Sequence, residues 1–512
     1  MVFRGRSEAF SEPGMGSYNV LDIDSTVCFE RDTWLGPYAT KKSFWSDKGL
    51  VDWEKVNWKS LHDFCYYNNS ARYATYNERS LAFRGTEDSH RGHSRAFPTT
   101  LTVQDETTGS EAIVEKRDIE ARETEFNPKP RTAVLLRAYS GIKYTENDKQ
   151  NIRVLINELS LRSGAEYEVF FLLQIKDAPL TKDAAHKHLP KEFWDMAVIW
   201  NDEQMAELYP EIPERANQVH IAQWFSVQKF AMDRPDFDYY WNWELDTRYV
   251  GNHYDLVEKL GAFAKKQPRK YLWERNERYY IPGVHGDYDT TFRRSIEETY
   301  GDDTVWGPVA LEGVYPAGPR PPVPSHREDN YEWGVGEDAD YISLGPIFDP
   351  LNSSWVDLDS VWGYQTFKNT PRRATIGTQS RCSRRLLIKM HEETLRGNHI
   401  GSEMTPQSVS LLHGFKAVYA PIPMFFDRAW QPKSLDKYFN PGPKGESGST
   451  SLTPYGWGLE GRFEGSSWYY RTSLPMKLYN NFLGWEDSGI GGDKVCLIYI
   501  LLRDRALMLI CS

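Results

Sequence analysis

Short apolar runs alternate with amphipathic segments between residues 131 and 243, and this alternation constrains the fold more than any other feature. The apolar runs are RTAVLLRAYS (131–140), YEVFFLLQI (167–175), MAVIW (196–200) and DFDYYWNW (236–243). Segments with helical spacing of apolar residues lie between them, at 146–162 and 220–233. Parallel strands need such crossover connections, and strands covered by helices on both faces are apolar throughout. The pattern therefore predicts an α/β fold with a mainly parallel sheet flanked by helices.

Two carboxylates, Glu244 and Asp246, follow the fourth run with one residue between them. Side chains at positions i and i+2 of a strand point the same way, and ligands of such sheets bind at the carboxyl ends of the strands. We therefore expect both carboxylates in one small volume, where their repulsion requires a cation or bound hydroxyls. Hard oxygen ligands suit Mg²⁺ or Mn²⁺ held together with phosphate oxygens. The alternative is an ordinary solvated acidic turn.

The composition is that of a globular protein. The 512 residues are 40% hydrophobic and 26% charged, which suits about two to four domains or one large domain with insertions. The net charge of −11 argues against a nucleic-acid-binding protein, which needs a basic face. Five cysteines without CxxC spacing argue against a zinc cluster or a disulfide framework. Without a signal peptide or a run of about eighteen apolar residues, we expect no transmembrane segment, and the compartment stays open between cytoplasm and secretory pathway.

The order strand, helix, strand, strand, helix, strand and acidic pair resembles the nucleotide-sugar half of GT-A glycosyltransferases, which have a Rossmann-related α/β fold. Glu244-Leu245-Asp246 matches a variant of their Asp-x-Asp motif. The resemblance implies that Asp246 binds Mn²⁺ or Mg²⁺ directly. It implies that Glu244 contacts the ribose or a metal-bound water. A divalent metal in this position stabilises the charge that develops on the leaving diphosphate.

The same resemblance assigns roles to further residues. The late segment GWEDSG resembles an acidic segment that faces the acceptor, so Glu486 or Asp487 is expected to be the general base that deprotonates an acceptor hydroxyl. The alternative is that these two acids only open a helix. Arg137 and Tyr139, at the end of the first strand, are expected to touch the nucleotide base or phosphate, with a surface arginine as the alternative. Trp243 is a further candidate for binding the donor.

Over about 130–490 the sequence also resembles a fungal family catalogued as domain of unknown function 3405. The matching segments are RTAVLLRAYSG (131–141), YYWNWELDTRYVG (239–251), VGEDADYISLGPIFDP (335–350), SRRLLIKMHEE (383–393), SEMTPQSVSLLHGFKAVYAP (402–421) and GWEDSG. The expected layout is an irregular N-terminal extension and linker (1–128), a nucleotide-sugar-binding α/β half (129–300), an acceptor-side half with a Pro/Gly-rich loop (301–490) and an apolar C-terminal tail (491–512).

These features predict a metal-dependent glycosyltransferase that moves a sugar from a nucleotide-sugar donor to a hydroxyl of a glycan, a protein or a secondary metabolite. The alternative is a non-catalytic carbohydrate-binding or scaffold protein on a degenerate transferase fold. The aromatic content of 14% favours this alternative, as does the lack of any His after His413, because GT-A enzymes often take a third metal ligand from that region. His253 is a weaker candidate for the metal, and Glu403 and His413 are weaker candidates for the acceptor. The sugar, the acceptor, the stereochemistry and the oligomeric state stay open.

Overall fold

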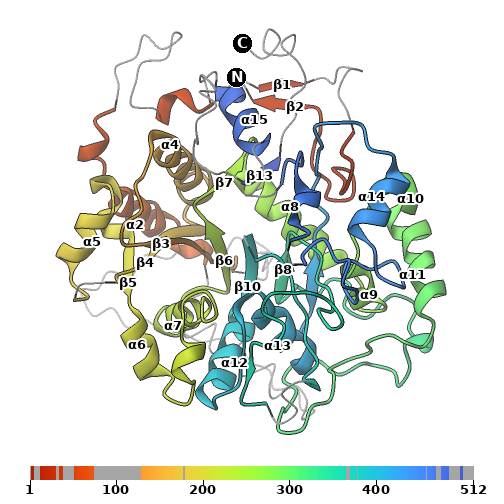
Figure 1. The fold of residues 1–512 in the computed structure, drawn as a ribbon. Helices are drawn as coiled ribbons and strands as arrows, with labels where there is room; N and C mark the ends of the chain where they lie inside the picture. The colour runs from red at the N-terminus through yellow and green to blue at the C-terminus, as the bar shows by residue number, and fades with distance from the viewer. Residues whose placement is uncertain are drawn as a thin grey trace, which may run out of the picture.

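The fold is seen in a computed structural model. It describes residues 2–4, 12–29, 34–38, 51–73, 128–176, 179–364, 369–377, 379–456, 458–468, 474–483 and 496–499. A seven-stranded sheet forms the centre of the molecule, with helices packed on both of its faces (Figure 1). The predicted α/β class, with a mainly parallel sheet flanked by helices, is confirmed, and the fold is Rossmann-like.

The central sheet has the order β12-β8-β10-β6-β3-β4-β5. Its strands are β3 (Thr132–Tyr139), β4 (Tyr167–Gln174), β5 (Ala197–Trp200), β6 (Tyr239–Glu244), β8 (Tyr341–Ser343), β10 (Gln379–Ser383) and β12 (Ala417–Tyr419). Only β10 runs antiparallel to its neighbours β6 and β8, and all other pairs are parallel. The four apolar runs of the sequence correspond to β3, β4, β5 and β6.

Small two-stranded pairs surround this sheet. They are β1 (Val2–Arg4) with β2 (Val27–Phe29), β9 (Val361–Trp362) with β11 (His399–Ile400), and β7 (Thr247–Tyr249) with β13 (Cys496–Tyr499). Strand β12 ends at Tyr419, before Pro421 and Pro423. Proline has no N–H to donate to a neighbouring strand.

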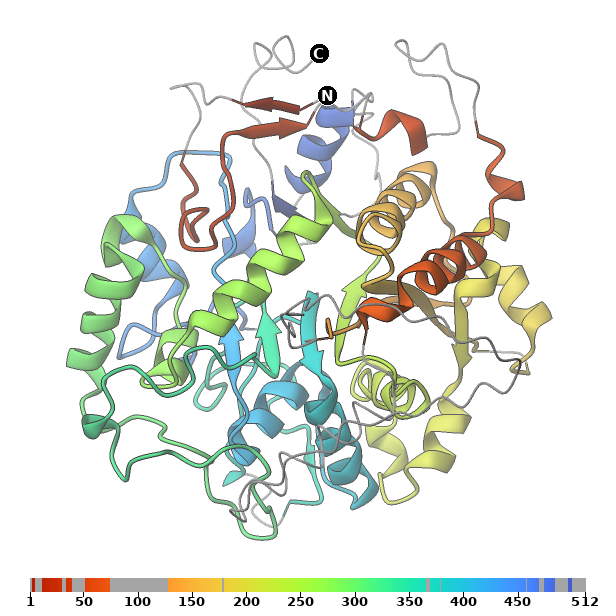
Figure 2. The same cartoon turned by 180° about the vertical axis from the view of Figure 1, so that it is seen from behind.

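The described helices are α2 (Trp58–Asn69), α4 (Glu146–Leu155), α5 (Lys182–His188), α6 (Asp202–Leu208), α7 (Phe225–Asp233), α8 (His253–Lys266), α9 (Leu272–Asn276), α10 (Pro282–His285), α11 (Arg293–Tyr300), α12 (Arg384–Leu395), α13 (Thr405–His413), α14 (Pro432–Phe439) and α15 (Leu474–Leu483). Helices α7 and α12 pack together on one face of the sheet, and α8 crosses the other face, seen from behind in Figure 2. No helix among the described residues is long and apolar enough to span a membrane.

The helices next to the site begin at residues held by hydrogen bonds. In α4, Thr145 and Asp148 cap each other, with Asp148 N donating to Thr145 Oγ1 at 3.2 Å and Thr145 N donating to the Asp148 carboxylate at 2.9 Å. The predicted helix at 220–233 begins only at Phe225. Its first residues are held instead by the segment around Ser402, whose carbonyl accepts from Trp224 Nε1 at 2.8 Å.

The described part of the N-terminal region packs on the sheet domain through a buried ion pair. Arg153 Nη2 donates to Glu192 Oε1 at 2.6 Å, and Arg153 Nε donates to Glu192 Oε2 at 3.0 Å. Trp58 of α2 donates its indole N–H to the same carboxylate at 3.0 Å, and the Arg153 guanidinium lies 4.3 Å from the centre of the Trp53 ring. The two tryptophan contacts join residues at least 100 positions apart in the sequence.

Candidate active site at the ends of β3 and β6

The chain changes direction in the sheet between β5 and β6. Strands β4 and β5 lie successively on one side of β3, whereas β6 returns to its other side. In doubly wound sheets ligands bind in the crevice at such a switch point, outside the carboxyl ends of the strands. The register of β3 and β6 pairs Arg137 directly with Glu244. Their side chains therefore leave the same face of the sheet at this edge.

The negative charge of Glu244 is only weakly compensated by neighbouring positive charges. Burial raises its pKa to about 7, the Arg137 guanidinium opposes this rise, and the nearby Asp246 adds to it. Among the described residues no lysine, arginine or histidine forms an ion pair with Glu244 or Asp246. Arg137 instead donates from Nη1 to Gln223 Oε1, just before α7. Two carboxylates thus lie at this edge of the sheet, and no described cation is paired to either.

Asp246 has a buried oxygen that the described chain leaves unsatisfied. Its Oδ1 is buried and has no hydrogen-bond partner, and burial raises the pKa of the carboxyl. The nearest cation by sequence, Arg248, is engaged elsewhere: Nε donates to Asn147 Oδ1 and Nη2 to Asp148 Oδ1, both at 2.5 Å. A buried acceptor without a donor is costly. The donor set of two carboxylates fits a hard divalent cation such as Mn²⁺ or Mg²⁺.

The other residues predicted to bind the donor differ in how far their side chains are buried. Tyr139 ends β3 with its side chain 49% exposed, and Lys176 Nζ lies 4.7 Å from the centre of its ring. Trp243 is only 2% exposed and sits in the core on the face opposite Glu244, with its ring centre 6.3 Å from that of His253. Arg137 is not a surface arginine: it is largely enclosed and bonded to Gln223.

A third acid, Glu403, lies beside this group on the short 3-10 helix η10 (Ser402–Met404). Gly377 N donates to Glu403 Oε1 at 3.1 Å. Burial raises the pKa of Glu403 to about 7, the Gly377 N–H opposes the rise, and the charge of Glu244 adds to it. A Cβ placed on Gly377 would lie 3.8 Å from Glu403 Cγ and 3.9 Å from Gln223 Nε2. Glu403, Gly377, Gln223 and Arg137 are therefore successive neighbours, and together they form one layer of contacting residues beside Glu244.

The remaining candidates from the sequence do not join this layer. His253 is held by Glu158, whose Oε2 lies 2.7 Å from His253 Nδ1. His413 Nδ1 lies 3.1 Å from the Tyr315 carbonyl oxygen, and its Nε2 lies 3.3 Å from Glu393 Oε1. Glu486 and Asp487 lie outside the described residues.

Comparison with known proteins gives one result. Residues 28–497, most of the chain, match the family described as protein of unknown function DUF3405. The chain belongs to the DUF3405 family. Searches of the curated proteins and of the solved structures found no match. The chemistry of this DUF3405 protein therefore has to be argued from its own residues.

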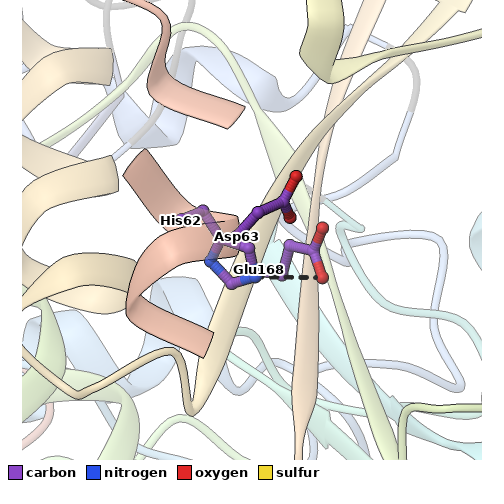
Figure 3. Close-up of side chains that lie close together, drawn as sticks. All are labelled: His62, Asp63 and Glu168. Atoms are coloured by element: carbon purple, nitrogen blue, oxygen red, sulfur yellow. Dashed lines mark ion pairs between the residues drawn. The ribbon is translucent and has the colours of Figure 1, made fainter. Parts of the chain in front are cut away.

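Within the described part of the DUF3405 chain, a further group with metal-ligand residue types consists of His62, Asp63 and Glu168 (Figure 3), whose ligand atoms lie within 4.8 Å of one another. This group lies near the amino end of β4, whereas Glu244 lies at the carboxyl end of β6. Arg131 Nη2 donates to Glu168 Oε2 at 3.0 Å, and Lys59 Nζ lies 3.6 Å from Glu168 Oε1. Burial alone would raise the pKa of Glu168, but the His62 hydrogen bond and nearby arginine charges lower it to about 2. Cations of the chain already neutralise this group, so it is a structural ion-pair network.

Proposed function

We propose that the chain is a metal-dependent glycosyltransferase that takes its sugar from a nucleotide-sugar donor. One observation carries the proposal: Glu244 and Asp246 meet at the switch point of the sheet without a paired cation, and Asp246 keeps a buried, unsatisfied oxygen. Buried acids are normally neutralised by a partner. A divalent cation bound by these two carboxylates, together with the diphosphate of a donor, would meet that requirement.

The neighbouring residues suit the same ligand. The Arg137 guanidinium lies near the end of β3, where it is oriented by its hydrogen bond to Gln223. There it supplies a positive charge to phosphate oxygens. The exposed ring of Tyr139 offers a surface on which a nucleobase can stack. A bound Mn²⁺ or Mg²⁺ would stabilise the negative charge of the leaving diphosphate. The protein residues bind the donor and orient its sugar toward the acceptor.

A thermal-shift experiment with UDP and GDP, each with and without Mn²⁺, tests the proposal. We expect a nucleoside diphosphate to raise the Tm of the wild type only when Mn²⁺ is present, because a ligand at about 100 times its Kd stabilises the native state by roughly 2.7 kcal/mol. Asp246→Asn should lose this rise. Asp63→Asn, the same substitution in the His62 group, is the control and should keep it.

Two results would contradict the proposal. One is a Mn²⁺-dependent rise in Tm that Asp246→Asn leaves unchanged, because the acidic pair would then not bind the metal. The other is glycan binding that survives both EDTA and Asp246→Asn while no nucleoside diphosphate binds. That second result would support the alternative of a non-catalytic carbohydrate-binding protein.

A further inference from the structure

Glu403 forms no ion pair with any described residue. Four buried glutamates are each paired with a basic side chain, Glu158 with His253, Glu168 with Arg131, Glu192 with Arg153 and Glu393 with Arg396, whereas the buried Glu274 and Glu446 have no ion pair among the described residues. The Glu403 carboxylate receives one hydrogen bond, from Gly377 N to Oε1, and Oε2 has no partner among the described residues. A partly enclosed carboxylate with one oxygen held and the other without a partner is suited to accept a proton.

The position of Glu403 is set by contacts that leave its second oxygen free. Gln407 Nε2 donates to the Glu403 carbonyl, and Thr375 N donates to the same carbonyl at 3.1 Å, so the backbone is held on both sides. The Gly377 N–H fixes Oε1. Gly377 has no side chain, and a Cβ at this position would be in ordinary van der Waals contact with both Glu403 and Gln223. The carboxylate is therefore oriented before any ligand binds.

A second polar side chain on the same face of the sheet lacks hydrogen-bond partners. Asn242 is 1% exposed, yet neither its amide nitrogen nor its amide oxygen has a hydrogen-bond partner. It lies two residues before Glu244 in β6, so both side chains leave the same face of the sheet. Buried amides are almost always hydrogen-bonded. The amide of Asn242 therefore has unused hydrogen-bonding capacity one strand position behind Glu244 on this face of the sheet.

We infer that Glu403 is the general base of the transfer. This inference rests on the proposed glycosyltransferase function. The O–H bond of the acceptor breaks and its proton passes to the Glu403 carboxylate. The freed electron pair of the acceptor oxygen forms the new bond to the anomeric carbon of the sugar, and the bond from that carbon to the diphosphate breaks. The diphosphate leaves with the electron pair, and Glu403 releases its proton to solvent.

Water can replace the acceptor, so the step is measurable without knowing the natural acceptor. The assay is Mn²⁺-dependent hydrolysis of a panel of UDP- and GDP-sugars by wild type, Glu403→Gln and Asp246→Asn. Glutamine keeps an oxygen that accepts from Gly377 N–H, so the site should stay folded. We expect Glu403→Gln to lower the hydrolysis rate by about 10²-fold or more, the usual contribution of a general base. Its Mn²⁺-dependent rise in Tm with UDP or GDP should equal that of the wild type.

The outcomes separate the two proposals. Hydrolysis by Glu403→Gln within about threefold of the wild-type rate overturns the role of Glu403 and leaves the proposed function intact. Wild type that binds nucleoside diphosphates but hydrolyses no donor also overturns it. Wild type without any Mn²⁺-dependent nucleotide binding overturns the proposed function itself. The exposed Glu298→Gln is the matched control and should change neither the rate nor the rise in Tm.

Discussion

Replacing Glu244 by glutamine should make the metal-free protein more stable at neutral and alkaline pH. Burial raises the pKa of this carboxyl from 4.5 to about 7. Its charged form is therefore disfavoured in the folded state, at about 1.36 kcal/mol for each pKa unit, or at most about 3 kcal/mol in total. Part of the side chain reaches solvent, so screening keeps the penalty below this upper value.

The sign of the effect follows from the two protonation states. Below pH 4.5 Glu244 is neutral in both the folded and the unfolded chain, and it costs nothing. Between pH 4.5 and 7 only the unfolded chain releases the proton, so the stability of the folded protein falls as the pH rises. Above pH 7 the full penalty applies. Glutamine has nearly the same shape and carries no charge, so it removes the penalty.

Urea unfolding followed by tryptophan fluorescence, in EDTA, measures this effect at pH 5 and pH 8. We expect Glu244→Gln to exceed the wild type by up to about 3 kcal/mol at pH 8 and by less than about 1 kcal/mol at pH 5. Glu298→Gln should stay within about 0.5 kcal/mol of the wild type. A Glu244→Gln variant no more stable than the wild type at pH 8 would refute the reasoning, because the carboxylate would then be compensated by the protein.

Two further predictions concern the ion pairs that hold the fold. The pKa of Glu168 is lowered from 4.5 to about 2, so its contribution of about 3 kcal/mol is complete above pH 4.5 and is lost as the pH falls toward 2. Urea unfolding of Glu168→Gln should show that loss at pH 7 and about half of it near pH 3, and a deficit independent of pH would contradict this assignment. Arg153→Met leaves Glu192 buried without its partner and should cost about 3–5 kcal/mol. Arg153→Met/Glu192→Leu should recover most of that cost in the same assay, and no recovery would show that the pair is not what destabilises the single variant.

Local pattern was enough to find the half of the sheet that carries the site. The four apolar runs became β3 to β6. Strands β3, β4 and the middle of β6 are buried on both faces, which imposes an apolar residue at nearly every position, whereas the edge strand β5 is only partly buried. The strand β10 could not be found this way. Its sequence, QSRCS, is polar, and it is a strand only because β6 and β8 supply its hydrogen-bond partners.

Local pattern along the chain was enough to place the acidic pair at the end of a strand, because the spacing of Glu244 and Asp246 and the apolar residues before them are local properties. Which residues surround the pair depends on the folded structure. The register of β3 against β6 brought Arg137 to Glu244, and packing of distant segments brought Gln223, Gly377 and Glu403 to the same layer. The Arg137–Gln223 hydrogen bond alone joins positions 86 residues apart. Their formation depends on the packing of the whole core, and no short-range pattern records it.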